Sequence, residues 1–248
     1  MARTMTELAP GILVTHSRRD TTASTVLVDN GRAVLIDPSW NPDELDDLAQ
    51  FITDSSLDVV AGFATHAHHD HVLWHPGFGD VPRWASIPAA ETARTHRAEL
   101  VELLGPDWPE RLATFVGRVE PLPGQHLPWP GPIAEVIVHD GHAIGHGAVW
   151  LEDSRVLLAG DMLSDVELPL ADDTGLEAYD VALGRLAPYV RRARVLVPGH
   201  GHPTGSPIDR WNTDRRYLDD VLAGRPVDDA RLAAPGMAAA HAANIALR

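Results

Sequence analysis

The chain has 248 residues, of which 44% are hydrophobic and none is cysteine. Its 35 acidic residues against 20 basic ones give a formal net charge of −15, which repels a phosphate backbone and argues against a nucleic-acid partner. Without cysteine there is no disulfide, no thiolate metal ligand and no cysteine nucleophile, so any metal must bind through nitrogen and oxygen.

The distribution of apolar residues indicates a globular protein. No stretch approaches the roughly 18 consecutive apolar residues that a membrane span needs, and residues 1–11 contain no apolar run of signal-peptide length. We therefore expect a cytoplasmic protein with no membrane partner. The length suits one domain, 1–248, with halves at about 1–120 and 121–224 and a tail at 225–248, and it leaves a homo-oligomer open.

Strand signals come first along the chain. Three segments are rich in β-branched and apolar residues, and we expect strands at 11–16, 24–29 and 32–37. Between the last two, Asn30-Gly31 supplies the residue types of a tight hairpin turn. Asn41-Pro42, followed by two acidic residues, then predicts the start of a helix over about 42–53.

The rest of the chain alternates strand and helix patterns. The predicted strands are 57–65, 133–139, 147–152, 155–160 and 194–197. The predicted helices are 88–104, 176–190 and 207–223, and the alanine-rich tail is a further candidate. This order is typical of an α/β protein, whose functional loops usually follow the strand ends.

The segment THAHHDHVLWH, residues 65–75, contains five of the fourteen histidines and one aspartate. Imidazole and carboxylate are the ligands that suit zinc and other first-row divalent metals. Because alternate residues of an extended segment point the same way, His66 and His68 can bind one ion. Asp70 and His71 lie on the turn that follows and can bind a second. A single histidine is more often a structural residue, but a cluster of this kind favours a metal site.

Three later predicted strands also end at, or are followed by, histidine or aspartate residues. The residues concerned are His139, His142 and His146 in HDGHAIGH, Asp161 in LLAGDML, and His200 and His202 in VLVPGHGHP. Each group stands beside a glycine where a strand stops. Ligands delivered from several strand ends to one edge of a sheet are what a preorganised metal site needs.

In this order the motifs resemble those of the metallo-β-lactamase superfamily, from the N-terminal hairpin to about His202. The H-x-H-x-D-H signature is intact, and it is followed by the histidine of a G-H segment, the aspartate of G-D and the histidine of P-G-H. The resemblance implies one metal held by His66, His68 and His142, a second held by Asp70, His71 and His200, and Asp161 bridging them. It also implies an α/β fold, the four-layer αββα sandwich, with two mixed sheets packed face to face and helices outside.

Several neighbouring residues are expected around these ligands. His200 is favoured over His202 because it directly follows Pro198-Gly199, although both can face the site from an extended stretch. His142 is favoured over His146 in the same way. The residues expected to hydrogen-bond a ligand or the substrate are Asp37, His69, His139, His146 and His202. The segments that follow the ligands, including Val72, Leu73, Trp74, Phe78 and residues 162–170, are expected to wall the substrate pocket. Trp74 and Phe78 would line its apolar entrance, with ordinary packing as the alternative.

The resemblance further implies a hydrolase. A hydroxide bridging two divalent ions, expected to be Zn²⁺ with Fe or Mn as alternatives, would attack an ester, thioester, lactone or amide bond of a small-molecule substrate. Asp70 would orient the hydroxide and take its proton. Asp161 favours the glyoxalase II-like and lactonase-like branch, because true β-lactamases typically lack this aspartate. Neither the tyrosine of lactonases nor the basic region of glyoxalase II is found in this chain.

Two other functions remain open at this point. A mononuclear iron persulfide dioxygenase-like oxidoreductase uses a similar scaffold and would employ His66, His142 and Asp161. A non-catalytic metal-binding protein is the second alternative, although its usual sign, erosion of the ligand set, is absent from the sequence.

Overall fold

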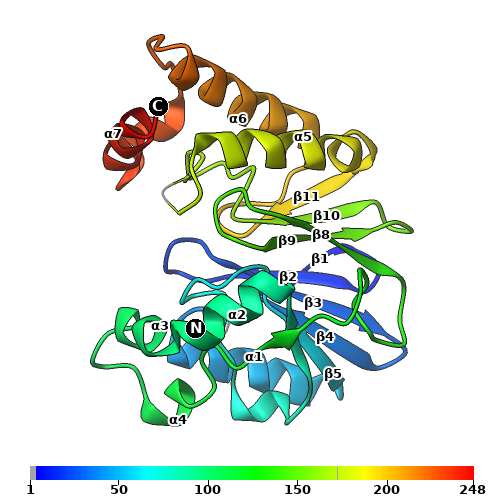
Figure 1. The fold of residues 1–248 in the computed structure, drawn as a ribbon. Coiled ribbons are helices and arrows are strands. Elements are labelled where there is room, and N and C mark those ends of the chain that lie inside the picture. Colours follow the sequence, from blue (N-terminus) through cyan, green and yellow to red (C-terminus); the bar gives the residue numbers. More distant parts are fainter. Residues whose placement is uncertain (1–3, 172) are drawn as a thin grey trace.

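The computed structural model describes residues 4–171 and 173–248. Two β-sheets lie face to face in the centre of the molecule, and helices cover the outer face of each sheet (Figure 1). This arrangement is the four-layer αββα sandwich expected from the sequence.

The first sheet has seven strands in the order β1-β2-β3-β4-β5-β6-β7. Their bounds are β1 Thr6–Ala9, β2 Ile12–His16, β3 Ala23–Asp29, β4 Arg32–Ile36, β5 Asp58–Phe63, β6 Arg83–Ala85 and β7 Glu120–Pro121. Strands β1 to β4 pair antiparallel, and β4 to β7 pair parallel. The predicted turn between β3 and β4 is confirmed, since Asn30 and Gly31 have φ values of 48° and 76°, as a tight hairpin turn requires.

The second sheet has four strands in the order β11-β10-β9-β8. Their bounds are β8 Ala134–His139, β9 His146–Leu151, β10 Val156–Gly160 and β11 Val195–Pro198. β8, β9 and β10 pair antiparallel, whereas β10 and β11 pair parallel. Because β10 and β11 run in the same direction, both deliver the residues that follow them to one edge of this sheet.

The helices divide between the two outer layers (Figure 1). Those over the seven-stranded sheet are α1 Pro42–Asp54, α2 Ile87–Thr95, α3 Arg97–Leu103 and α4 Glu110–Ala113, with the short 3₁₀ helix η1 Pro76–Phe78. Those on the other side are α5 Leu176–Arg192, α6 Pro207–Leu222 and α7 Met237–Ala246, with the short η2 Ala230–Ala233. Among the described residues, no helix is long and apolar enough to cross a bilayer.

The buried apolar residues form three clusters that correspond to the three interfaces between layers. The cluster between the sheets includes Val34, Phe63 and Leu158, each at most 3% exposed. One outer cluster packs α1 and α2 against the first sheet, and the other packs α5, α6 and α7 against the second. Both sheets are therefore covered on both faces, which explains why several strands are apolar on both sides.

The single helix predicted over 88–104 is wrong. The structure has two helices, α2 and α3, which meet at His96, where φ is −103° and ψ is 17°. The guanidinium of Arg97 donates to the carbonyls of Ala113, Thr114 and Val116. These bonds fix the start of α3 against a distant segment, and a helical periodicity in the sequence contains no sign of such a contact.

Candidate metal centre

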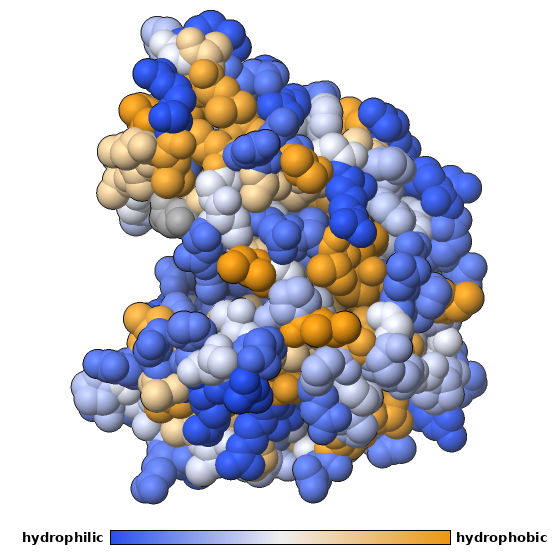
Figure 2. All heavy atoms as spheres, viewed as in Figure 1, coloured by the Kyte–Doolittle hydropathy of each residue, from blue (hydrophilic) through white to orange (hydrophobic). Residues whose placement is uncertain are grey.

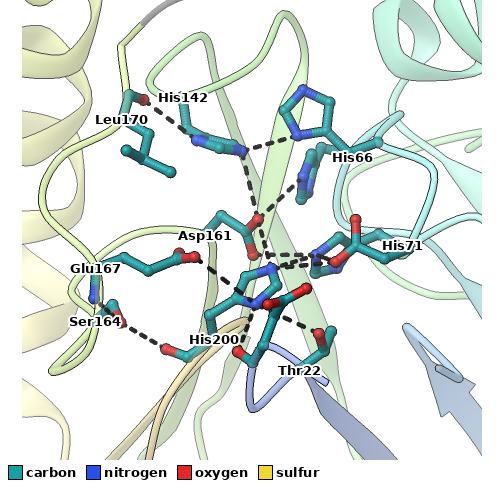
Figure 3. Close-up of polar contacts among 12 residues, drawn as sticks. Thr22, His66, His71, His142, Asp161, Ser164, Glu167, Leu170 and His200 are labelled. Atoms are coloured by element: carbon teal, nitrogen blue, oxygen red, sulfur yellow. Dashed lines mark hydrogen bonds and ion pairs between the residues drawn. The ribbon is translucent and has the colours of Figure 1, made fainter. Parts of the chain in front are cut away.

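Four segments that are distant in sequence converge at the ends of β5, β8, β10 and β11. Their imidazole and carboxylate groups form two clusters, within each of which the potential ligand atoms all lie within 4.8 Å of one another. The first contains His66, His68, His142 and Asp161, and the second contains Asp70, His71 and His200. The structure thus brings together all seven residues predicted as metal ligands (Figure 3).

In the first cluster, three histidines surround one oxygen of Asp161. The Nε2 atoms of His66 and His142 each lie 3.4 Å from Asp161 Oδ2. His68 Nδ1 lies 3.0 Å from His142 Nε2. A tetrahedral zinc ion with bonds of about 2.0–2.1 Å has ligand atoms about 3.3 Å apart, so this spacing fits one such ion.

The second cluster has the same spacing. His71 Nε2 lies 3.4 Å and His200 Nε2 3.2 Å from Asp70 Oδ2, and the two Nε2 atoms are 3.3 Å apart. Asp161 reaches this cluster as well, with Oδ1 3.2 Å from His71 Nε2 and Oδ2 3.2 Å from His200 Nε2. The carboxylate of Asp161 therefore lies between the two clusters (Figure 3).

Each of the five clustered histidines also has an oxygen atom at its other ring nitrogen. The pairs are His66 Nδ1 with Thr65 Oγ1 at 3.0 Å, His68 Nε2 with Asp173 Oδ2 at 2.8 Å, His71 Nδ1 with Asp37 Oδ2 at 2.9 Å, His142 Nδ1 with the Leu170 carbonyl at 3.2 Å, and His200 Nδ1 with the Asp20 carbonyl at 2.9 Å. Carbonyl and carboxylate oxygens only accept, so the outer nitrogens donate and the inner nitrogens present a lone pair when the ring is neutral. This is the arrangement of metal-ligating histidines.

Thr65 completes this pattern for His66. Its Oγ1 donates to Asp37 Oδ2 at 2.7 Å, so the same oxygen can accept from His66 Nδ1. Asp37 thereby orients His71 directly and His66 through Thr65. The sequence-based expectation that Asp37 hydrogen-bonds a ligand agrees with this geometry.

Burial keeps two histidines of the first cluster neutral. It lowers the pKa of His142 to about 4, although Asp161 opposes the shift. Burial also lowers the pKa of His66 well below its usual value. A neutral imidazole is the form that binds a metal, because only then is the inner nitrogen free of a proton.

In the second cluster, attraction between the carboxylates and the histidines outweighs burial in setting the pKa values. Burial alone would raise the pKa values of Asp70 and Asp161, but neighbouring histidines, chiefly His71 and His200, lower both well below the usual range. The same attraction raises the pKa values of His71 and His200 against the effect of burial. Carboxylates held ionised in a buried site are suited to balance cationic charge.

Two atoms at the centre have unused bonding capacity. His66 Nε2 and Asp161 Oδ1 are buried, and neither makes a hydrogen bond of acceptable geometry. Buried polar atoms are normally satisfied, and such exceptions are often explained by an unobserved ion or water. A divalent cation between the clustered atoms would satisfy both, so the residues fit the metals that the resemblance implies.

His146 lies behind the clusters. Its Nε2 accepts from the backbone N–H of Asp161 at 3.0 Å, and its ring stacks on His66 and on His139. A Cβ atom on Gly160 would collide with the His146 ring, so the glycine allows this close approach. His142, and not His146, reaches the first cluster, as favoured from the sequence.

His202 points away from the clusters, whereas His200 reaches them. The His202 side chain is 63% exposed, and its Nδ1 lies 3.1 Å from Asp165 Oδ2. The expectation that His202 contacts a ligand or substrate is therefore not supported by its position. His69 lies at the rim, 5.0 Å from Trp40 between ring centroids, and borders the pocket above the clusters.

Trp74 and Phe78 do not line an entrance, and that expectation is wrong. Each is 2% exposed within the core beneath α1, and their rings pack edge to face with centroids 5.2 Å apart. Trp74 lies so close to Gly62 that a Cβ atom there would collide with the indole. The segment after the ligand loop turns back into the core, so its large apolar residues pack inside the protein.

The pocket above the clusters has a volume of about 260 Å³. Glu167 and Leu170 lie in the 162–170 segment that the sequence reasoning expected to wall the pocket, whereas it did not identify Asp20, Trp40 and Asp173. These last three residues come from three loops and share no motif, so only their place in the fold reveals them. Figure 2 shows the surface hollowed, on the left, between the layer of α5 to α7 and the layer of α1 to α4.

Comparison with known proteins agrees with this architecture. A family model described as the metallo-beta-lactamase superfamily matches residues 18–218. The metallo-beta-lactamase type 2 of Bacteroides fragilis is 26% identical over 186 residues, which cover 74% of this chain and 70% of that protein.

Solved structures show the same fold at lower identity. A metallo-beta-lactamase from Pontibacter korlensis has a TM-score of 0.67 at 21% identity, covering 88% of this chain and 99% of that one. A metallo-beta-lactamase family protein from Thermus thermophilus has a TM-score of 0.66 at 24% identity, with coverages of 88% and 82%. A sec-alkylsulfatase from Pseudomonas sp. has a TM-score of 0.66 at 16% identity. The match covers 90% of this chain and 42% of the sulfatase chain. Since the family model spans most of the sequence, the chain belongs to the metallo-beta-lactamase superfamily.

Proposed function

We propose that the protein is a dinuclear metal-dependent hydrolase that cleaves an ester, thioester, lactone or amide bond of a small-molecule substrate. The observation that carries this proposal is the pair of clusters sharing Asp161, with each clustered histidine paired to an oxygen at its outer nitrogen. When bound, two divalent ions lower the pKa of a shared water toward about 7 and polarise a carbonyl group.

The chain's own residues supply the remaining functions. His66, His68 and His142 would hold one ion, and Asp70, His71 and His200 the other, with Asp161 between them. Asp70 keeps its carboxylate ionised in a buried position, so it can accept a hydrogen bond from the nucleophilic water and orient it. Leu170, which is partly exposed, offers apolar surface on the pocket wall for the acyl or leaving group.

Apart from the metal ions themselves, the side chains that border the pocket offer no cation to a substrate carboxylate, which supports a neutral or cationic substrate. No arginine is among the described residues that border the pocket, and all 20 basic residues of the chain are arginines, so no lysine can anchor a substrate carboxylate. Three acidic residues border it besides the clustered ones, namely Asp20, Glu167 and Asp173. The nearby Arg19 stacks on Trp40 and lies 3.7 Å from Asp20, so its charge is already partly balanced.

This charge pattern also supports a substrate other than a β-lactam. β-Lactams and glutathione thioesters carry carboxylates, which a site normally recognises with arginine or lysine. The position of Asp161 between the two clusters also supports a substrate other than a β-lactam, because the family resemblance implies that true β-lactamases typically lack this aspartate. We therefore place the protein in the acyl-hydrolase branch as part of the same proposal.

Metal analysis combined with an ester panel tests the proposed function. Purified protein should contain close to two ions per chain, and His68→Ala should lose both metal and hydrolysis, while His126→Ala, an exposed histidine, should retain both. One iron per chain with oxygen consumption on a persulfide would favour the dioxygenase alternative. Full turnover by the metal-free protein would refute the proposal.

A pair of esters tests the charge of the substrate. 4-Nitrophenyl butyrate is neutral, whereas the 4-nitrophenyl ester of succinic acid carries a carboxylate on an acyl chain of similar length. We expect a higher kcat/KM for the neutral ester by about tenfold, equivalent to roughly 1.4 kcal/mol. Burial raises the pKa of Glu167 to about 7, so Glu167→Gln should bring the two values of kcat/KM closer together at a pH above 7, where this carboxyl is charged. Equal values of kcat/KM in the unmodified protein would contradict the inference about charge.

A further inference from the structure

The loop that follows β10 contacts one ligand of each metal cluster. Ser164 Oγ donates to the His200 carbonyl at 2.7 Å, and the Leu170 carbonyl accepts from His142 Nδ1 at 3.2 Å (Figure 3). Glu167 lies between them, with Oε1 3.9 Å from His200 Nδ1. The 164–170 loop therefore supports both ligands and forms one wall of the pocket.

The C-terminal segment, residues 225–248, binds the main chain of this loop. Arg231 is 6% exposed, and its Nη1 donates to the carbonyls of Ser164 at 3.0 Å and Glu167 at 2.8 Å. Asn244 Nδ2 in α7 donates to the Pro169 carbonyl at 2.6 Å. In Figure 1, α7 lies beside the segment that connects β10 to α5.

A third contact comes from Met237 at the start of α7. Its Sδ accepts from the backbone N–H of Leu168 at 3.2 Å, and both side chains belong to the same apolar cluster. Four backbone groups of one short loop are thus bonded by the C-terminal segment. Buried backbone groups left without a partner cost free energy, so these contacts favour one conformation of the loop.

Arg231 is itself fixed by charged partners. It donates to Asp214 Oδ1 at 2.6 Å and pairs with Asp229 at 2.8 Å. Asp214 also accepts from Tyr179 Oη and from the backbone N–H of Leu163. The guanidinium is therefore held between α6 and the loop, and it cannot move away without leaving buried charge unpaired.

We propose that residues 225–248 form a C-terminal clamp that positions the 164–170 loop and thereby sets the shape of the substrate pocket. The clamp lies outside residues 18–218, the part of the chain that matches the family model. The residues that form the two clusters thus lie within the matched part of the chain, whereas the segment that positions Glu167 and Leu170 lies outside it. Its effect on substrate selection depends on the proposed hydrolase function, but its effect on the loop does not.

A purely structural role would be to cover the apolar face of the second sheet and its helices. Met237 does contribute to that cluster. However, Arg231 and Asn244 direct their donors to loop carbonyls, and a covering segment does not require such bonds. Arg231 and Asn244 are therefore positioning residues that act on the pocket through the loop.

Hydrogen exchange tests the clamp independently of activity. Asn244→Leu keeps a side chain of similar size and removes the donor to the Pro169 carbonyl and to Tyr217 Oη in α6. Ile245→Ala alters the adjacent residue of α7, which is 46% exposed. We expect amides of the 164–170 loop in Asn244→Leu to exchange on the order of tenfold faster, while amides of β10 and β11 keep their rates. Ile245→Ala should leave the loop unchanged.

Arg231→Lys provides a second variant that retains the charge beside Asp214 and Asp229. One ammonium cannot satisfy all the partners of the guanidinium, so the loop should again exchange faster in a folded protein. With any ester that the enzyme turns over, KM should rise several-fold in both variants while kcat changes less. Unchanged loop exchange, or a uniform increase across the molecule, would overturn the clamp. If no ester is hydrolysed even by the unmodified protein, the hydrolase proposal fails and the exchange result still decides the role of the clamp.

Discussion

The carboxylate of Asp161 occupies the space into which a Cβ atom on Gly199 would project. The two residues follow neighbouring parallel strands, and the backbone N–H of Gly199 donates to the Gly160 carbonyl at 2.6 Å. The glycine before His200 therefore leaves room for the group that lies between the two metal clusters.

Gly199→Ala should displace Asp161 and reduce metal binding. The methyl group would meet a carboxylate oxygen and backbone atoms, which have little freedom to move. If the protein binds two ions as proposed, we expect Gly199→Ala to bind at least one ion fewer per chain and to hydrolyse esters about 10–100-fold more slowly. Gly205→Ala is the control, because a Cβ atom there has its nearest neighbour at 4.0 Å. Normal metal content in Gly199→Ala would contradict this account of the site.

Asp37→Asn should weaken metal binding without removing a ligand. Asp37 accepts from Thr65 and from His71, so an amide in its place weakens the orientation of both His71 and His66. Loss of such outer partners typically costs roughly 10–100-fold in metal affinity or activity. Competition with a chromogenic chelator measures the affinity, and Asp58→Asn, an exposed site at the start of β5, serves as control. An unchanged dissociation constant would argue against the orienting role.

Trp74→Ala should affect stability and not substrate binding. The indole is buried against Phe78 and Gly62 and donates to the Gly79 carbonyl at 3.1 Å. We expect a loss of about 3–5 kcal/mol in the free energy of unfolding, as measured by urea denaturation of the metal-free protein. KM for a neutral ester should stay within about twofold of the original value, since hydrophobic residues distant from a pocket act mainly through packing. A large rise in KM with little loss of stability would show that Trp74 contacts the substrate.

The contribution of Glu44 to the free energy of unfolding should be lost at acid pH. Burial acts to raise the pKa of this carboxyl, but hydrogen bonds from Ser17, the Arg18 backbone and Asn41 overcome that effect and lower it. A carboxyl whose pKa is lower in the folded state stabilises the protein above its unfolded pKa of about 4.3, and this contribution disappears as pH falls through the folded pKa.

Glu44→Gln isolates this contribution. We expect the substitution to lower the free energy of unfolding by about 1–3 kcal/mol at pH 7, because it weakens buried hydrogen bonds to a charged group. The difference between the two proteins should shrink as pH falls below about 4.3. Urea unfolding of the metal-free proteins at several pH values measures it. A difference that stays constant across this range would exclude linkage to Glu44.

The local sequence predicts much of the fold because the signals act over short distances. Asn30-Gly31 and Asn41-Pro42 fix a turn and a helix start through backbone preferences that need no distant partner. The apolar strands are also predictable from local sequence, because a nearly continuous run of apolar residues indicates a strand that is buried on both faces. The break at His96 was missed because it depends on a contact between Arg97 and residues 113–116.

The sequence by itself determined which groups are available for metal chemistry, since imidazoles and carboxylates beside glycines at strand ends are visible in the chain and in its family motif. Only the tertiary structure decided the surroundings of those groups. It places Trp74 in the core, turns His202 outward, and brings Asp20 and Asp173 to the pocket. The reason is physical: side-chain chemistry is a local property, whereas burial, orientation and charge environment depend on segments that meet only when the chain folds.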